Sequence, residues 1–258
     1  NIVLGNTANA DEAVYIEAKA GSVTAEKAIE SIDKNVTVIG KDSVTLKDKV
    51  TAETNVTLTS TNGKVTTRDT VTAGTDGSIG MSASTGISAV KALQAGTNVT
   101  LQSTNGNVTA GDSITATAGS VTASTGKGDV SVQGVTAGTD ISLTTEQGAI
   151  TANGALNATD EVNVSATTSG AIQVNDTITG KTITVHTGSG NITTADTAAL
   201  TAITDGGSIT VDTASGNVVL GNTASADEAV YIEAKAGSVT AKEAVESADT
   251  DVTVIGKL

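Results

Sequence analysis

The first 42 residues of the chain return, almost unchanged, as its last 42. Residues 11–20 recur letter for letter as residues 227–236, an offset of 216 residues, and nine of the 42 positions differ. Most differences are mild, such as Ile29 against Val245, but one exchanges Glu26-Lys27 for Lys242-Glu243. Self-similarity at a fixed period is the signature of repeat proteins, so we expect this chain to be a piece of a longer tandem array.

A shorter period lies inside the long one. A small turn residue followed by a β-branched residue recurs in steps of about 20 to 23 residues, with one step of about 26, which is the range of one solenoid coil. About ten such steps fill 216 residues, so the two periods agree and predict about 11 coils in the chain. The markers begin at Gly21, Asp42, Gly63, Gly86, Gly106, Gly128, Gly148, Gly170, Gly190, Gly216 and Gly237.

Each coil contains three short runs in which aliphatic residues alternate with Thr, Ser or Asn. In one coil these runs cover residues 108–110, 114–116 and 121–123. Alternation with period two places one residue type on each face of a strand, and Gly, Asn and Asp separate the runs as turns. Stacking such coils pairs each strand with its equivalents about 4.8 Å above and below. The pattern therefore predicts an all-β, single-stranded parallel β-helix, a β-solenoid that is continuous over residues 1–258.

The composition favours the same fold. Aromatic residues make up 1% of the chain, and the two that occur, Tyr15 and Tyr231, hold the same position in the two copies of the repeat. A globular core of this size normally uses several aromatic side chains, whereas the narrow interior of a solenoid needs only small aliphatic ones. Proline is absent, as expected where every strand pairs on both sides.

The charge balance excludes some partners. Fourteen basic residues against 28 acidic ones give a net charge of −14, and Arg68 is the only arginine. Such a surface repels nucleic acid and anionic membranes and keeps molecules in solution apart. Cysteine is absent, which suits a protein exported as an unfolded chain. No apolar run approaches the roughly 18 residues of a membrane span.

Coils such as those over residues 55–63 and 98–106, each beginning Asn-Val-Thr-Leu and ending Ser-Thr-Asn-Gly, resemble the repeat regions of filamentous-haemagglutinin-type exoproteins. These are large secreted adhesins of Gram-negative bacteria, and the resemblance covers essentially the whole chain. It implies a right-handed β-helix that serves as a stiff shaft, an extracellular or cell-surface location, and adhesion to surface glycans or proteins of a host or neighbouring cell.

Candidate catalytic and metal-binding residues are few. His186 is the only histidine and follows the inward residue Val185, so we expect it on the outer surface, without a catalytic role. Acidic residues recur at similar turns, as in Gly-Thr-Asp at Asp76 and Asp140, and stacked turn acids are a hypothetical Ca²⁺ site. Asp is also simply favoured at turns. We predict that the chain has no enzymatic activity and binds no cofactor, apart from the hypothetical Ca²⁺ site at Asp76 and Asp140.

Three alternatives follow from the same patterns. Parallel β-helices include carbohydrate-binding and carbohydrate-active proteins, which use acidic residues clustered on one face of several coils. Outward Thr-x-Thr pairs, as at Thr57 and Thr182, are the unit of an ice-binding surface. Asn-x-Ser/Thr sites are potential glycosylation sites, although a turn that enters an alternating strand has the same composition. They occur at Asn35, Asn55, Asn98, Asn107, Asn157, Asn163, Asn175 and Asn191.

The sequence starts in one strand pattern, over residues 1–4, and stops in another, over residues 252–255. The first and last coils of a solenoid expose unpaired N–H and C=O groups unless something covers them. We therefore expect both coils to continue, either covalently into further repeats or by docking of another copy. The function predicted from the sequence is that of a structural rod.

Overall fold

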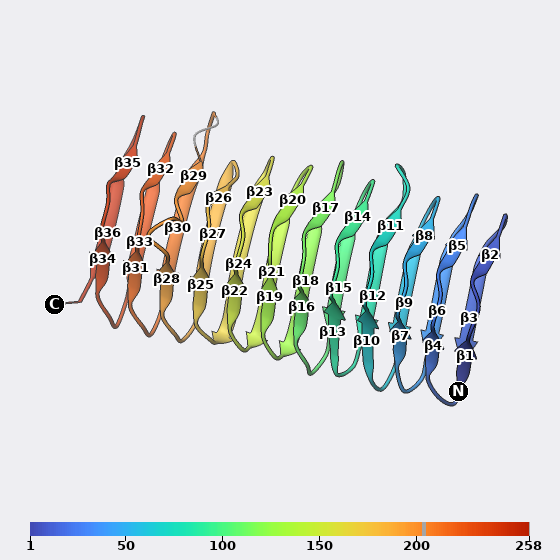
Figure 1. Ribbon diagram of the computed structural model, residues 1–258. Helices are drawn as coiled ribbons and strands as arrows, with labels where there is room; N and C mark the ends of the chain where they lie inside the picture. The colour runs from blue at the N-terminus through green and yellow to red at the C-terminus, as the bar shows by residue number, and fades with distance from the viewer. Residues whose placement is uncertain (203–204, 258) are drawn as a thin grey trace. The chain divides into compact units, whose positions relative to one another are not determined.

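Alternation of aliphatic with small polar residues produces short parallel strands throughout the described residues, 1–202 and 205–257, of the computed structural model. They belong to two compact units, Asn1–Gly126 and Lys127–Leu258. Each unit contains six coils, numbered 1–6 and 7–12 along the chain, and each coil contributes one strand to each of three sides. Figure 1 shows the strands of one side following one another from coil to coil within each unit.

In the first unit the strands run as follows. The first side holds β1 (Ile2–Leu4), β4 (Val23–Ala25), β7 (Val44–Leu46), β10 (Lys64–Thr67), β13 (Gly86–Ala89) and β16 (Val108–Ala110). The second side holds β2 (Ala8–Ala10), β5 (Ile29–Ser31), β8 (Val50–Ala52), β11 (Val71–Ala73), β14 (Leu93–Ala95) and β17 (Ile114–Ala116). The third side holds β3 (Val14–Ala18), β6 (Val36–Gly40), β9 (Val56–Ser60), β12 (Ile79–Ala83), β15 (Val99–Ser103) and β18 (Val121–Lys127).

The second unit repeats this order. Its first side holds β19 (Val130–Val132), β22 (Ile150–Ala152), β25 (Ile172–Val174), β28 (Ile192–Thr194), β31 (Val218–Leu220) and β34 (Val239–Ala241). Its second side holds β20 (Val135–Ala137), β23 (Leu156–Ala158), β26 (Ile178–Thr179), β29 (Leu200–Ala202), β32 (Ala224–Ala226) and β35 (Val245–Ser247). Its third side holds β21 (Ile141–Gln147), β24 (Glu161–Ser169), β27 (Thr182–Thr187), β30 (Ser208–Thr213), β33 (Val230–Ala234) and β36 (Val252–Gly256).

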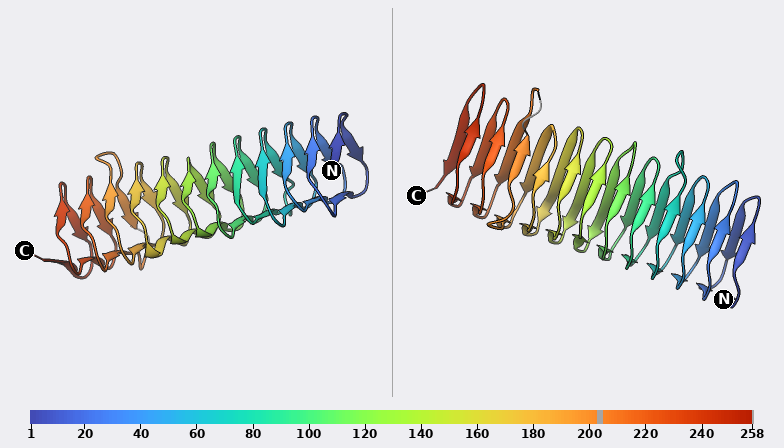
Figure 2. Two further views of the ribbon diagram at one scale, coloured as in Figure 1. Left: turned by 90° about the horizontal axis from the view of Figure 1, so that it is seen from below. Right: turned by 45° about the horizontal axis from the view of Figure 1, so that its top comes forward.

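The register places like residues on top of one another. Val23 pairs with Val44, Leu93 with Ile114, and Ile183 with Ile209. The aliphatic member of each alternating pair faces inward and is almost fully buried away from the end coils, whereas the Thr or Ser between them lies at the surface. Each inward residue therefore contacts its equivalents one coil away, and the columns form the core of each unit. Figure 2 shows the strands of successive coils stacked on one another within each unit.

Threonine hydroxyls close the corner between the third side and the next first side. Thr187 Oγ1 donates to the carbonyl oxygen of Gly170 at 2.8 Å, and Thr213 Oγ1 donates to that of Gly190 at 2.9 Å. Thr145 makes the same bond to Gly128 at 2.9 Å. These inward hydroxyls are buried, and the bonds satisfy them at a point where the backbone turns.

The predicted fold class is confirmed: both units are all-β solenoids with parallel strands on three sides. The predicted number of coils, about 11, was too low, because the 36 strands of the described residues make twelve coils. The 11 markers are boundaries between coils, so the residues before Gly21 form an additional coil. In the coil with the long step before Gly216, residues 195–199 separate β28 from β29.

The strands of the coil predicted over residues 108–123 begin at the predicted residues, but the strand on the third side ends later than predicted. For example, the run predicted over residues 121–123 extends to Lys127. The single continuous solenoid over residues 1–258 stays a prediction. Within the described part of the chain, no helix has the length and apolar character required to cross a membrane.

Candidate functional site

Asparagine side chains form ladders at two corners of the coils. Before the third side, Asn35 Oδ1 accepts the N–H of Asn55 at 3.0 Å, and Asn55 Oδ1 accepts the N–H of Ser78 at 2.9 Å. Before the first side, Asn191 Oδ1 accepts the N–H of Asn217, and Asn217 Oδ1 accepts that of Ser238, both at 2.9 Å. Asn35, Asn55 and Asn191, three of the potential glycosylation sites, therefore bind backbone between successive coils.

The two Ca²⁺ candidates occupy equivalent turns in different units. Asp76 lies exposed in the turn between β11 and β12, in coil 4, and Asp140 precedes β21, in coil 7. Asp140 Oδ1 accepts the N–H of Glu161 at 3.2 Å, the interaction that asparagine makes at this corner. Among the described residues no three His, Asp or Glu side chains gather as a metal-binding group. The Ca²⁺ site stays a prediction, and the structure gives Asp140 a role in coil stacking.

His186 lies on the outer face of the third side, as predicted, and makes a side-chain hydrogen bond that the sequence did not reveal. Its Nδ1 lies 2.8 Å from Asp212 Oδ2 on the adjacent strand β30. Ser165 on β24 pairs in register with His186, so serine, histidine and aspartate occupy three successive coils. Asp212 follows His186 by 26 residues, so a fixed period of about 21 does not align them.

The column of Ser165, His186 and Asp212 contains the three residue types of a nucleophilic catalytic site. Asp212 orients the His186 ring, as a carboxylate orients a catalytic histidine. However, no hydrogen bond joins the Ser165 hydroxyl to His186 among the interactions of the described residues. The strands β24, β27 and β30 also pair along their length, so their backbone N–H groups are used between coils and do not converge on an oxyanion position. The pair is therefore best described as a surface hydrogen bond that links two coils.

The two tyrosines hydrogen-bond to glutamates on their own strands. Tyr15 Oη donates to Glu17 Oε2 at 2.9 Å, and Tyr231 makes the equivalent bond to Glu233. The hydrogen bond and the negative charge of the carboxylate raise the pKa of each phenol above its ordinary value of 10.0, because both favour the protonated phenol.

This shift predicts an alkaline titration. Both tyrosines are expected to ionise above pH 10, followed by tyrosinate absorbance, to which no tryptophan contributes in this chain. The double variant Glu17→Gln/Glu233→Gln removes the two negative charges and should lower the midpoint. The control Glu146→Gln, at an exposed residue in another coil, should leave it unchanged. A midpoint that is the same in all three proteins would contradict the assignment.

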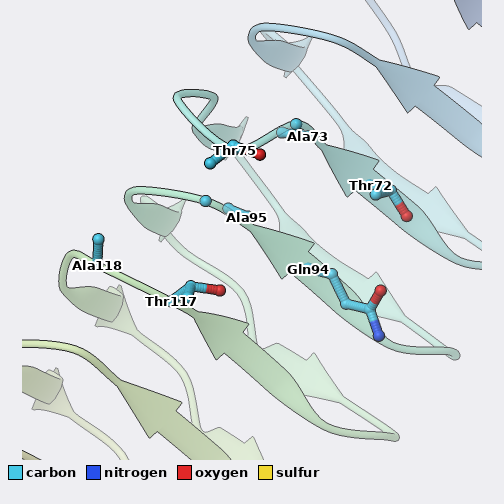
Figure 3. Close-up of a pocket in the computed structure, with 9 residues that line it drawn as sticks. Thr72, Ala73, Thr75, Gln94, Ala95, Thr117 and Ala118 are labelled. Carbon is cyan, nitrogen blue, oxygen red and sulfur yellow. The ribbon is translucent and has the colours of Figure 1, made fainter.

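A shallow groove of about 370 Å³ runs over the second side of the first unit, across β11, β14 and β17 (Figure 3). Glycines and small side chains line it because the turns here carry no long residues. Gln94 and the hydroxyls of Thr72, Thr75 and Thr117 are its polar side-chain groups. The groove contains no aromatic ring on which a sugar could stack and no charged side chain. It can hold an extended chain but offers few specific contacts.

Outward threonines repeat only over short stretches, as where Thr24, Thr45 and Thr66 pair in register on the first side. On the third side, Thr57 and Thr59 of β9 pair with Gly80 and Ser82 of β12. In the second unit, Thr184 of β27 pairs with Asn163 of β24. A regular flat array of Thr-x-Thr is therefore interrupted in each unit.

Comparison with known proteins identifies no relative: no family model, no curated protein and no solved structure matches the chain.

Proposed function

We propose that this chain is a section of a structural shaft, of the kind that a secreted bacterial cell-surface adhesin or an extracellular filament requires, and that the shaft lengthens by stacking coil on coil. Its function is then mechanical. The columns of aliphatic residues and the backbone ladders perform it, and the outer acidic surface keeps neighbouring shafts apart.

The observation that carries this proposal is the different burial of the two copies of the repeat. Val230 and Ile232 are fully buried in coil 11, between coils 10 and 12, whereas their copies Val14 and Ile16 in coil 1 are partly exposed. Conversely, Val38 in coil 2 is buried under coil 3, whereas its copy Val254 in coil 12 is 50% exposed. The same sequence therefore accepts a further coil on each of these faces.

A glycine supports the same conclusion. A Cβ atom at Gly221 would lie 2.5 Å from the carbonyl carbon of Ala195 in the preceding coil, so only glycine fits there. Its copy Gly5 would meet nothing within 4 Å. The repeat therefore carries, at the position shared by Gly5 and Gly221, the residue that stacking on a preceding coil requires.

A chain with one additional period tests the proposal. Duplicating residues 1–216 ahead of residues 217–258 adds ten coils, which at about 4.8 Å each should lengthen the particle by roughly 48 Å without changing its cross-section. Small-angle scattering and electron microscopy measure both dimensions, with the original chain as the control. A longer chain that forms a wider, compact particle, or that leaves the added residues unfolded, would refute the shaft.

A carbohydrate-binding or carbohydrate-active solenoid is the second candidate, and the groove across β11, β14 and β17 is the observation that favours it. If it is correct, the folded chain binds or cleaves a polysaccharide, and Gln94→Ala weakens this while the circular dichroism spectrum is kept. Binding that Gln94→Ala does not alter, or the absence of binding to a panel of acidic and neutral polysaccharides, would favour the shaft.

A further inference from the structure

We infer that the first side of the first unit carries a binding site for a sugar acid, a hydroxyl-rich molecule with a single carboxylate. The site is a pocket of about 360 Å³ at the corner that leads into β10, β13 and β16. It shares no residue with the groove across β11, β14 and β17, and it does not depend on the shaft function. Its lining includes Lys64, Thr85, Ser88, Gly106, Asn107 and Thr109.

An interruption of the polar ladder at this corner opens the pocket. In coils 2 and 3 serines occupy the ladder position, and Ser43 Oγ donates to Ser22 Oγ at 2.8 Å. In coils 4 and 5 the equivalent residues are Lys64 and Gly86, which pair in register. An ammonium group has no acceptor and glycine has no side chain, so neither residue can continue the ladder. The space that a serine or asparagine side chain would take at Gly86 is therefore open.

The missing side chain at Gly86 lets Lys64 lie across the next coil. Lys64 Cε is 3.6 Å from the point that a Cβ atom on Gly86 would occupy. The backbone oxygen and nitrogen of Asn107, at the start of coil 6, are 3.0 and 3.5 Å from the same point. Lys64 and Asn107 thus meet over a buried glycine, although their coils are not adjacent. The lysine stem packs on the backbone, and the ammonium group belongs to the pocket wall.

The ammonium group of Lys64 has no carboxylate partner. None of the ion pairs within the described part of the chain includes it, although Asp42 lies beside Gly63 in the preceding coil. Residues 64–109 contain three basic and two acidic residues, whereas the second unit contains five basic and sixteen acidic ones. An anion is therefore repelled less at this pocket than over the second unit.

Neutral hydroxyl groups surround the charge. In the described part of the chain, no side-chain hydrogen bond uses the hydroxyl of Thr85, Ser88 or Thr109. Ser88 and Thr109 pair in register on the outer faces of β13 and β16, so their side chains are about 4.8 Å apart along the stack. Each hydroxyl can donate and accept a hydrogen bond, and a sugar ring presents groups of the same kind.

The pocket matches one negative charge on a body larger than a simple anion. A volume of about 360 Å³ lies at the lower end of the range of small-molecule sites. The single positive charge of Lys64 balances one carboxylate, and the ammonium-to-carboxylate hydrogen bond is of the strong, charge-assisted kind. A phosphate group carries close to two charges at neutral pH and would keep one of them uncompensated. The free hydroxyls then face the hydroxyls of the sugar ring.

Titration of the full chain with glucuronate, followed by NMR spectroscopy of the backbone amides, tests the inference. The amide signals of Gly86, Ser88 and Gly106 should shift and reach saturation. Lys64→Gln should weaken binding about tenfold, because it removes the charged donor. Lys64→Arg keeps the charge and should retain most of the affinity. Added salt should weaken binding to the unmodified chain, since the site is open to solvent.

Glucose and acetate separate the two parts of the ligand. Glucose has the ring without the charge, and acetate has the charge without the ring. Each should bind at least about tenfold more weakly than glucuronate, because each lacks one set of hydrogen bonds. Glucose that binds as tightly as glucuronate would overturn the role of Lys64, and acetate that does so would overturn the recognition of a sugar.

Two variants outside the pocket serve as controls. Lys91→Gln removes the same charge from an exposed lysine, and Gln94→Ala alters the groove across β11, β14 and β17. Both should leave glucuronate binding unchanged, and circular dichroism checks that every variant is folded. Glucuronate that shifts no amide of the pocket, or that binds Lys64→Gln as tightly as the unmodified chain, overturns the inference. The length of the chain with an added period does not depend on this result, so the shaft and the site fail separately.

Discussion

Replacement of Gly170 by alanine is expected to destabilise the second unit by about 3 kcal/mol, a large part of the stability of a single domain. Gly170 has a φ angle of +142°, which residues with a side chain rarely adopt. A Cβ atom there would lie 1.6 Å from the carbonyl oxygen of Gly148, in the coil before it. The backbone cannot move away without breaking the ladder between β22 and β25, which follow these glycines.

Gly80→Ala is the matched control for this prediction. Gly80 lies inside strand β12, and a Cβ atom there would meet nothing within 4 Å. Alanine should leave stability unchanged or raise it by up to about 1 kcal/mol, because it restricts the unfolded chain. Urea denaturation followed by circular dichroism measures both variants. Equal midpoints for the two variants would show that the corner does not need glycine.

Leu58→Ala is expected to cost about 3 kcal/mol in the first unit. Leu58 is fully buried in β9, and its register partners are Val38 in coil 2 and Met81 in coil 4. Truncation leaves a cavity in the column. The neighbouring coils cannot close it, since hydrogen bonds hold their strands at a fixed spacing of about 4.8 Å.

The control for this variant is its neighbour on the same strand. Thr57 faces outward and is exposed, so Thr57→Ala should change stability by no more than about 0.5 kcal/mol. Chemical denaturation of the two variants compares one residue of each face of β9. A similar loss for both would contradict the assignment of inward and outward faces.

Several features of the site were not predictable from one period of the sequence. The pair of His186 with Asp212 depends on a coil of 26 residues, and the pair of Lys242 with Asp196 joins coils that are not adjacent. Their positions follow from turn lengths and from a side chain reaching over Gly221. Asp76 and Asp140 show the opposite case, because similar Gly-Thr-Asp motifs suggested a shared site, whereas they belong to coils 4 and 7 of different units.

The sequence by itself determined the fold class, the three strands of each coil and the inward residues. It could do so because period-two alternation and a near-constant coil length fix the face of each residue and its partner one coil away. Only the tertiary structure decided the number of coils, the asparagine and threonine bonds at the corners, and the different burial of identical sequences such as residues 14–18 and 230–234. Burial and side-chain pairing depend on whether a neighbouring coil is present, and that is a property of the stack and not of the strand.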